Sequence, residues 1–163
     1  MEEISVDLDD AWIITGSAHS VYDDFEWIDY LRIKLRQMKE ANKPVLGICF
    51  GHQLIADTFG GKAELNSKGW ELGSCQVELT DEAINNKLFS GLPNPLDVYQ
   101  SHQDVVLAIP ENSILMAKNS MGIQSFVYDE QFYGVQFHPE FTKTAMETYL
   151  DIRYKKGIID NKP

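Results

Sequence analysis

The sequence predicts an α/β fold in which a mixed, mainly parallel sheet is flanked by helices. In the first half of the chain, short β-branched apolar runs alternate with longer segments of helical periodicity. Strand, helix, strand and helix in that order are typical of a parallel sheet with helices on its faces. In the second half, short strand candidates follow one another with Gly, Pro, Asn or Asp between them, which indicates an antiparallel portion.

The first predicted strand covers residues 11–15 (AWIIT), and a Gly-Ser pair ends it. A helix is predicted over about 24–41, because apolar residues recur there at helical spacing, namely Trp27, Ile28, Leu31, Leu35 and Met38. The run 45–48 (VLGI) is predicted to be a second buried strand. Residues 51–59 form a second predicted helix, which a pair of glycines ends.

The second half of the chain is predicted to be rich in short strands. The candidates share an apolar, β-branched or aromatic composition and cover 74–79, 97–100, 105–109, 113–118, 123–128 and 132–137. A last amphipathic segment, about 143–156, is a predicted helix. The sequence contains no repeat or interdomain linker, so we expect one domain over residues 1–163.

Composition describes an ordinary globular protein and argues against several classes of function. Hydrophobic residues make up 44% and charged residues 24% of the chain. A net charge of −11 argues against a nucleic-acid surface, which needs a basic stripe. No apolar run approaches the roughly 18 residues of a membrane span, and the acidic start lacks the apolar region of a secretory signal. We therefore expect a cytoplasmic protein with neither a membrane nor a nucleic acid as partner.

The two cysteines, Cys49 and Cys75, lack the spacing of a CxxC motif or a zinc site, so we expect no disulfide, metal or cofactor. Cys49 lies in GICFG, where the second predicted strand turns into a helix. Flanking glycines allow a tight turn, as in a nucleophile elbow with cysteine in place of serine. The helix N-terminus is expected to lower the thiol pKa. From the elbow alone, a nucleophile and a small buried hydrophobic residue are about equally good interpretations.

His138, which ends the last predicted strand in GVQFHPEF, is the candidate base for Cys49. Pro139 favours an extended backbone at His138, so His138 and Glu140 can point the same way. A carboxylate beside an imidazole fixes its tautomer, which is the role of the third residue in a catalytic triad. Alone, this motif also fits a capped strand end with a solvated glutamate; with Cys49 it predicts a Cys49–His138–Glu140 triad.

Together, G-x-C-x-G-x-Q at 47–53 and GVQFHPE at 134–140 resemble the motifs of class I glutamine amidotransferases, the branch with a Cys-His-Glu triad. The segments ITGSAHSVYDD (14–24) and YQSHQDVV (99–106) fit the same family, especially glutaminase domains like that of GMP synthase. The resemblance extends from about Leu8 to Phe141. It implies a flavodoxin-like sheet that lacks the family's first strand–helix–strand unit, so that the first predicted strand becomes an apolar edge strand.

The resemblance also implies a reaction. Cys49 would attack the side-chain amide of glutamine, forming a γ-glutamyl thioester and releasing ammonia. His138 would transfer the protons and Glu140 would orient it. The oxyanion hole would consist of backbone N–H groups of Phe50 and Gly16.

Substrate contacts are implied for three further residues. Gln53 matches the elbow glutamine of the family. Ser101 and His102 match a segment whose backbone holds the α-amino and α-carboxylate end of the substrate. Glu71 falls where a related strand borders the pocket, and Trp70 is expected to be a packing residue.

Three functions are compatible with these residues. The leading hypothesis is a glutamine amidotransferase-type hydrolase, and the alternative is a hydrolase of γ-glutamyl peptides or amines with the same triad. The third is a non-catalytic regulatory module of the same fold. The expected partners are glutamine or a γ-glutamyl substrate, a separate ammonia-accepting synthase subunit, or a second chain that pairs with the exposed sheet edge.

Overall fold

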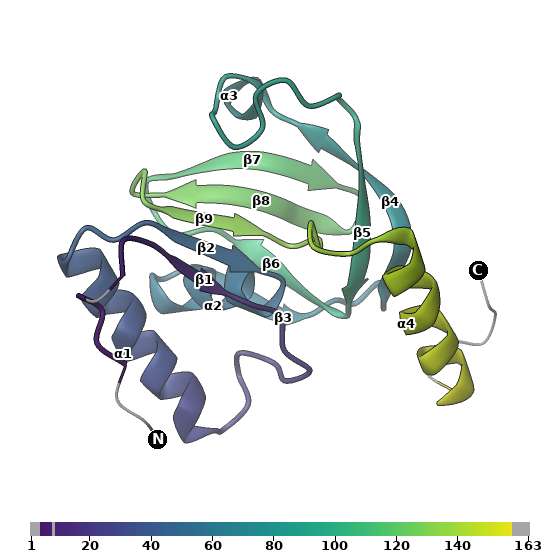
Figure 1. Ribbon diagram of the computed structural model, residues 1–163, viewed down its shortest axis with the longest axis horizontal. Coiled ribbons are helices and arrows are strands. Elements are labelled where there is room, and N and C mark those ends of the chain that lie inside the picture. The colour runs from purple at the N-terminus through teal and green to yellow at the C-terminus, as the bar shows by residue number, and fades with distance from the viewer. Residues whose placement is uncertain (1–3, 8, 158–163) are drawn as a thin grey trace.

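The structure is a computed structural model, and it describes residues 4–7 and 9–157. Within this part of the chain, nine strands form one sheet and four helices accompany it (Figure 1). The strands are β1 (Trp12–Ile14), β2 (Val45–Ile48), β3 (Lys62–Leu65), β4 (Glu71–Leu79), β5 (Leu96–His102), β6 (Asp104–Ala108), β7 (Ser113–Asn119), β8 (Gly122–Tyr128) and β9 (Phe132–Val135). The helices are α1 (Glu26–Glu40), α2 (Phe50–Thr58), α3 (Asp81–Ile84) and α4 (Lys143–Lys155). Leu8, where the family resemblance begins, lies outside the described residues.

The sheet is mixed, with the strand order β1-β2-β9-β8-β7-β4-β5, and β6 joins β3 to β8. Among the described residues, β1–β2 and β2–β9 are parallel pairs and the other six pairs are antiparallel. The expected mixed sheet with helices is confirmed, but most of its pairs are antiparallel, contrary to the expectation of a mainly parallel sheet. Turns of two or three residues join β7 to β8 and β8 to β9, and such short turns connect only antiparallel neighbours.

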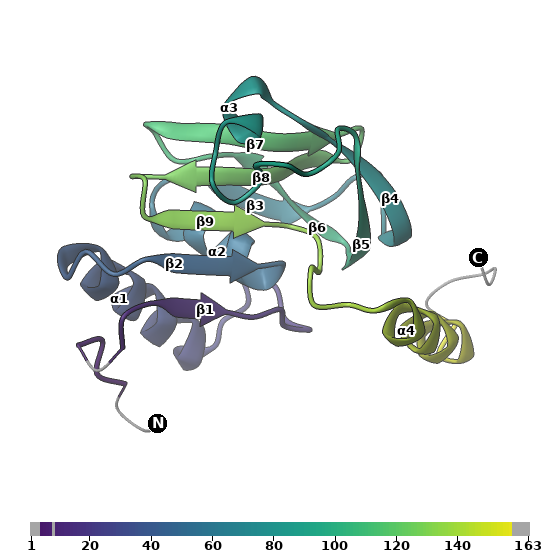
Figure 2. The same cartoon turned by 45° about the horizontal axis from the view of Figure 1, so that its top comes forward.

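Two hydrophobic clusters cover the two faces of the sheet. On one face, α1 and α2 pack side by side (Figures 1 and 2) and bury a cluster that includes Ile28, Leu35, Leu54, Ile55 and Phe132. On the other face, the long β4–β5 pair curls around the end of the sheet, and α3 lies above it (Figure 1). The second cluster includes Val77, Ala83, Val98, Met116 and Val135.

Most predicted elements are confirmed, and two short elements were not predicted. The helices at 24–41, 51–59 and 143–156 correspond to α1, α2 and α4, and the strand candidates correspond to β1, β2 and β4–β9. The two additional elements are β3, a four-residue strand, and α3, a single turn. Thr80 caps α3 by accepting a hydrogen bond from the Ala83 N–H at 3.2 Å.

The strand β1 forms one edge of the described sheet, as expected. Ile13 is 64% exposed there. An apolar groove of about 410 Å³ lies beside this edge, lined by residues that include Trp12, Ile13, Leu46, Leu88 and Tyr133. Across residues 4–7 and 9–157, no helix is long and apolar enough to cross a membrane.

Candidate active site

Cys49 occupies the turn between β2 and α2 in a strained backbone conformation. Its φ of 53° and ψ of −102° are unusual for a residue with a side chain, as in a nucleophile elbow. The two flanking glycines are needed because neighbouring backbone comes very close. A Cβ on Gly47 would lie 2.5 Å from the Gly51 carbonyl, and a Cβ on Gly51 would lie 2.2 Å from the Ile14 oxygen.

The parallel register of β1, β2 and β9 brings the predicted residues to one edge of the sheet. Ile14 pairs with Gly47, which pairs with Gly134, so the chain segments that follow these strands emerge side by side. Gly16 lies at the meeting point. A Cβ on Gly16 would lie 3.2 Å from His138 Cε1 and 3.6 Å from Cys49 Cβ.

His138 is oriented by Glu140 and leaves one ring nitrogen free. Its Nδ1 lies 2.7 Å from Glu140 Oε1, and its ring stacks on Phe141 with centroids 4.3 Å apart. His138 is buried, and its Nε2 has no hydrogen-bond partner among the described residues. Because Nδ1 faces a carboxylate, the neutral ring carries its proton there, and Nε2 presents a lone pair.

The Cys49 thiol is protonated in the free protein, because burial raises its pKa to about 12. The backbone N–H of Phe50 opposes this shift, whereas the negative charges of Glu140 and Asp104 add to it and Arg153 opposes it. The N–H group at the start of α2 thus lowers the thiol pKa as expected, but desolvation outweighs it, so the net shift is upward. A thiolate at Cys49 would therefore have to form by transfer of the thiol proton to a base.

Two open cavities meet at Cys49. The first cavity, of about 230 Å³, is lined by the loop 17–20, Cys49 and further residues that include Gln53, Trp70, Ser101, His102, Asp104 and Arg153. The second cavity, of about 260 Å³, is lined by residues that include Gly16, Cys49, His138, Glu140, Tyr149 and Arg153. Cys49, Ser101 and Arg153 line both cavities, so the predicted residues gather around Cys49.

A buried polar network supports the floor of the first cavity. Gln53 donates through Nε2 to the Asp104 carbonyl at 3.2 Å and to Gln136 Oε1 at 3.1 Å. His102 Nδ1 lies 2.8 Å from the same carbonyl, and Nε2 lies 3.1 Å from Glu71 Oε2. Both ring nitrogens of His102 therefore lie beside oxygen atoms that accept hydrogen bonds, the Asp104 carbonyl and the Glu71 carboxylate.

Glu71 does not line either cavity but lies behind His102, its partner in the β4–β5 register. Burial would raise the Glu71 pKa, but hydrogen bonds and charge from His102, with further hydrogen bonds from Asn119 and Gln124, hold it below its ordinary value. Glu71 therefore holds His102 in place rather than facing a substrate.

Sequence reasoning missed two groups at the cavities. The Asp104 carboxylate accepts hydrogen bonds from the Ser20 hydroxyl at 2.5 Å and the Tyr22 hydroxyl at 3.0 Å, which fixes the loop over the first cavity. Arg153 comes from α4 and stacks on Trp70, so Trp70 is more than a packing residue. No motif marks either group, because each depends on contacts between distant segments.

The structure also describes two further histidines, His19 and His52, and the second cysteine, which are not part of the predicted triad. His19 lines the first cavity and packs against Phe25, with ring centroids 4.6 Å apart. His52 is fully buried in α2, and Cys75 is a half-buried free thiol in β4. The described residues contain no group of three or more His, Cys, Asp or Glu placed to hold a metal ion.

Comparison with known proteins decides the family. The family model "Glutamine amidotransferase class-I" matches residues 3–155. The chain belongs to the class I glutamine amidotransferases. This confirms the family that the Cys49 and His138 motifs predicted.

Relatives of this class I glutamine amidotransferase include two kinds of enzyme. Gamma-glutamyl peptidase 4 of Arabidopsis thaliana is 35% identical over 153 residues, with 92% of this chain and 61% of the relative covered. One of the subunits of the glutamine-hydrolysing GMP synthase of Pyrococcus abyssi is 41% identical over 112 residues, with 68% of this chain and 57% of the relative covered. The chain thus spans about three fifths of the length of these curated relatives.

Solved structures of glutamine amidotransferases share the fold. The crystal structure of a glutamine amidotransferase from Thermotoga maritima is 26% identical, with a TM-score of 0.78 and coverage of 91% of this chain and 66% of that one. A glutamine amidotransferase from Methylobacillus flagellatus has a TM-score of 0.83 at 21% identity, covering 93% of this chain and 60% of that one.

Proposed function

We propose that this chain hydrolyses the side-chain amide of glutamine through Cys49 and releases ammonia. The observation that carries the proposal is one arrangement: Cys49 in a strained elbow, beside His138, whose Nδ1 is held 2.7 Å from Glu140 Oε1. A nucleophile, a base with one free nitrogen and an orienting carboxylate make up the set that acyl transfer requires.

In the first half of the reaction, His138 Nε2 takes the thiol proton while Cys49 Sγ bonds to the amide carbon. The negative charge that develops on the amide oxygen faces the backbone N–H groups of Phe50 and Gly16. The carbon–nitrogen bond then breaks, and His138 gives its proton to the leaving nitrogen. The products are ammonia and a γ-glutamyl thioester on Cys49.

In the second half, water replaces the amine. His138 Nε2 takes a proton from water, the hydroxide adds to the thioester carbon, and the carbon–sulfur bond breaks. The Cys49 sulfur recovers a proton from His138, so the enzyme returns to its starting state. The net reaction converts glutamine and water to glutamate and ammonia.

A second candidate substrate class is γ-glutamyl peptides or amines, cleaved by the same steps. Relatives named gamma-glutamyl peptidases favour it, with 35% identity for one of them. The second cavity also favours it, because it is open beside Cys49 and His138 and so leaves room for a leaving group larger than ammonia.

The partner that we propose for a glutamine-hydrolysing reaction is a separate ammonia-accepting synthase subunit, because several relatives are themselves named as single subunits of GMP synthase. The exposed edge of β1 offers a place for a second chain to pair. We also propose that the protein acts in the cytoplasm, since both cysteines are free thiols and a reducing compartment keeps thiols in this state.

The proposal is tested with an electrophilic glutamine analogue and a turnover panel. Intact-mass measurement should show a single adduct on Cys49, and ammonia release from glutamine should be lost in Cys49→Ser. Cys75→Ser is the matched control, because it removes the other thiol, and it should keep both properties.

The same panel separates the candidate functions. Faster cleavage of γ-glutamyl dipeptides than of glutamine, with or without a synthase subunit, would replace the main proposal by the second candidate. Absence of Cys49-dependent turnover on every γ-glutamyl compound would leave a non-catalytic module of this fold and overturn both enzymatic proposals.

A further inference from the structure

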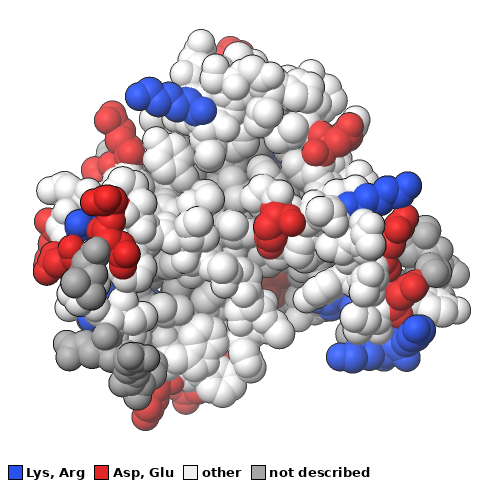
Figure 3. All heavy atoms as spheres, in the orientation of Figure 1, with Lys and Arg blue, Asp and Glu red and all other residues white. Residues whose placement is uncertain are grey.

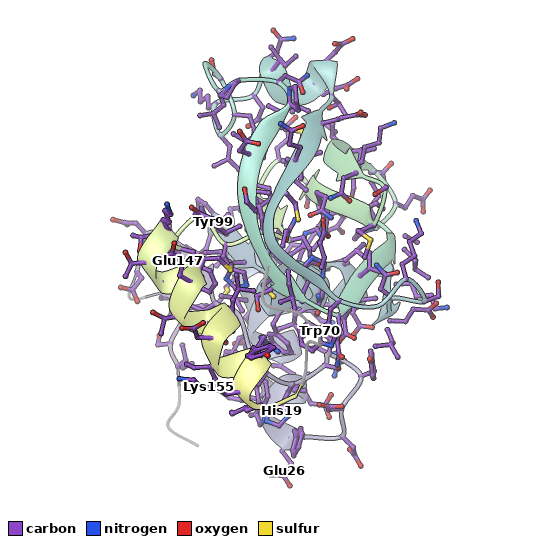
Figure 4. The ribbon with its side chains drawn as sticks, turned by 90° about the vertical axis from the view of Figure 1, so that its right-hand side faces the viewer. His19, Glu26, Trp70, Tyr99, Glu147 and Lys155 are labelled. Atoms are coloured by element: carbon purple, nitrogen blue, oxygen red, sulfur yellow. The ribbon has the colours of Figure 1, made fainter. Side chains whose placement is uncertain are left out.

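Arg153 places a cation at the junction of the two cavities. It lies on α4 and lines both cavities together with Cys49. In Figure 4, α4 crosses the front of the molecule, with Trp70 and His19 near its C-terminal half. The guanidinium charge is close enough to Cys49 to oppose the rise in the thiol pKa.

Aromatic rings fix the guanidinium on two sides. Its carbon lies 4.3 Å from the centroid of the Trp70 ring and 5.1 Å from that of the Tyr149 ring. The Arg153 Nε is shielded from solvent and has no hydrogen-bond partner among the described residues. A buried N–H group of this kind normally has an acceptor.

Arg32 shows how an arginine with a structural role is satisfied in the same chain. It contacts the carboxylates of Asp29 at 2.7 Å and Asp57 at 2.8 Å, and it donates to the Val21 carbonyl. Arg153 forms no such ion pair within residues 4–7 and 9–157, although the chain carries a net charge of −11. In Figure 3, blue Lys and Arg side chains and red Asp and Glu side chains both lie over α4, at the right of the molecule.

The second cavity is the side on which the leaving amine must lie. His138 lines this cavity and not the first one, and its Nε2 is the atom that protonates the leaving nitrogen in the proposed reaction. Glu140 lines the same cavity and would repel an anionic leaving group. Arg153 opposes this repulsion and offers Nε–H and Nη–H side by side, the geometry that binds a carboxylate with two hydrogen bonds.

We propose that Arg153 binds a carboxylate on the leaving amine, so that the enzyme prefers γ-glutamyl amino acids and peptides to neutral γ-glutamyl amines. This inference rests on the proposed hydrolysis of γ-glutamyl amides and names the determinant that selects among them. Arg153 is a specificity-determining residue, and the chemistry itself stays with Cys49 and His138.

The test compares two substrates that differ by one charge, γ-glutamylglycine and γ-glutamylglycinamide, on the full 163-residue chain. The ratio of their kcat/KM values should favour the acid and should fall by about tenfold or more in Arg153→Met, because a charge-assisted hydrogen-bond pair is lost. Arg153→Lys should give an intermediate ratio, since it keeps the charge without the planar pair of donors. Lys155→Met is the matched control, because it removes an exposed cation of α4 that lines neither cavity, and it should keep the parental ratio.

An unchanged ratio in Arg153→Met overturns the inference. A second pair of substrates, glutamine and its α-carboxamide, tests whether Arg153 instead binds the α-carboxylate of the glutamyl group. If Arg153→Met changes the preference within this pair instead, the guanidinium binds the glutamyl α-carboxylate and the inference is wrong.

A binding measurement keeps this test separate from the test of the proposed function. In a Cys49→Ala background, calorimetry should show tighter binding of γ-glutamylglycine than of its amide, and Arg153→Met should remove the difference. Cys49-dependent turnover without an acid preference refutes the role of Arg153 alone. Absence of turnover refutes the proposed function, and the calorimetric comparison still decides whether Arg153 binds a carboxylate.

Discussion

His138 Nδ1 and Glu140 Oε1 lie 2.7 Å apart, on residues separated by a single proline. The Glu140 side chain is 49% exposed, whereas that of His138 is 9% exposed. The carboxylate therefore reaches from the solvent side to hold a buried imidazole, and Nε2 stays without a hydrogen-bond partner among the described residues. Glu140, which contributes little to the hydrophobic core, thus both orients the His138 ring and places a negative charge beside it.

Glu140→Gln should lower kcat by about ten- to a hundredfold, because the amide keeps the shape but loses the charge that stabilises the imidazolium. The fold and binding of a glutamine analogue should stay intact, as measured by thermal unfolding and calorimetry. Glu147→Gln removes an exposed acidic group of α4 and serves as the control. If Glu140→Gln turned over glutamine as fast as the parent at every pH, the triad would reduce to a Cys-His dyad.

The Cys49 thiol should be alkylated slowly at neutral pH. With a pKa of about 12, its thiolate fraction rises about tenfold per pH unit between pH 7 and 10. The rate constant for iodoacetamide, measured in a Cys75→Ala background that leaves one thiol, should follow this slope without a plateau. A plateau below pH 8 would show that the free enzyme already holds a thiolate, and proton transfer to His138 would then precede substrate binding.

Gly51→Ala should destabilise the fold by about 3 kcal/mol, because the new methyl group would lie 2.2 Å from the Ile14 carbonyl oxygen, which belongs to backbone. Gly60→Ala is the control: nothing lies within 4 Å of a Cβ there, so only its φ of +92° costs free energy, about 1 kcal/mol. Urea unfolding measures both. An equal decrease in the free energy of unfolding for the two variants would mean that the elbow backbone relaxes to make room for the methyl group. The close contact with Ile14 would then not explain the glycine at position 51.

His52 should make the protein less stable in acid. Burial lowers its pKa to about 3, and the charge of His102 adds to this shift. Below the ordinary pKa of about 6.5 the unfolded chain binds a proton that the folded protein does not bind. The free energy of unfolding is therefore unaffected by His52 above pH 6.5 and falls by about 1.4 kcal/mol per pH unit between pH 6.5 and 3.

Denaturant titrations of the parent and of His52→Leu at several pH values measure this contribution. Leucine keeps an apolar body in contact with Phe126, whose ring centroid lies 4.9 Å from that of His52. The variant should lose the part of the acid slope that His52 causes. A difference in stability that stays constant from pH 7 to pH 4 would contradict a buried neutral imidazole.

The grouping of Cys49, His138 and Glu140 and most of the fold could be predicted because their signals are local. Helical periodicity marks α1. The glycines on either side of Cys49 mark a tight turn in which neighbouring backbone comes too close for a side chain. The high pKa of Cys49 could not be predicted, because it depends on how deeply the surrounding segments bury the thiol. The position of Arg153 depends on where α4 packs against the rest of the protein. Amphipathic spacing predicts the helix and its apolar face but not its packing site.

The register of β2 and β9 has a consequence for how the protein folds. Cys49 and His138 each follow one of these strands, and they meet only after two segments far apart in the chain have paired in parallel. Closing such a long loop costs chain entropy before any contact stabilises it, and non-local parallel pairing is slow. Cys49 and His138 can therefore meet only once this strand pair is in register: a chain that has collapsed and formed its helices still lacks their arrangement.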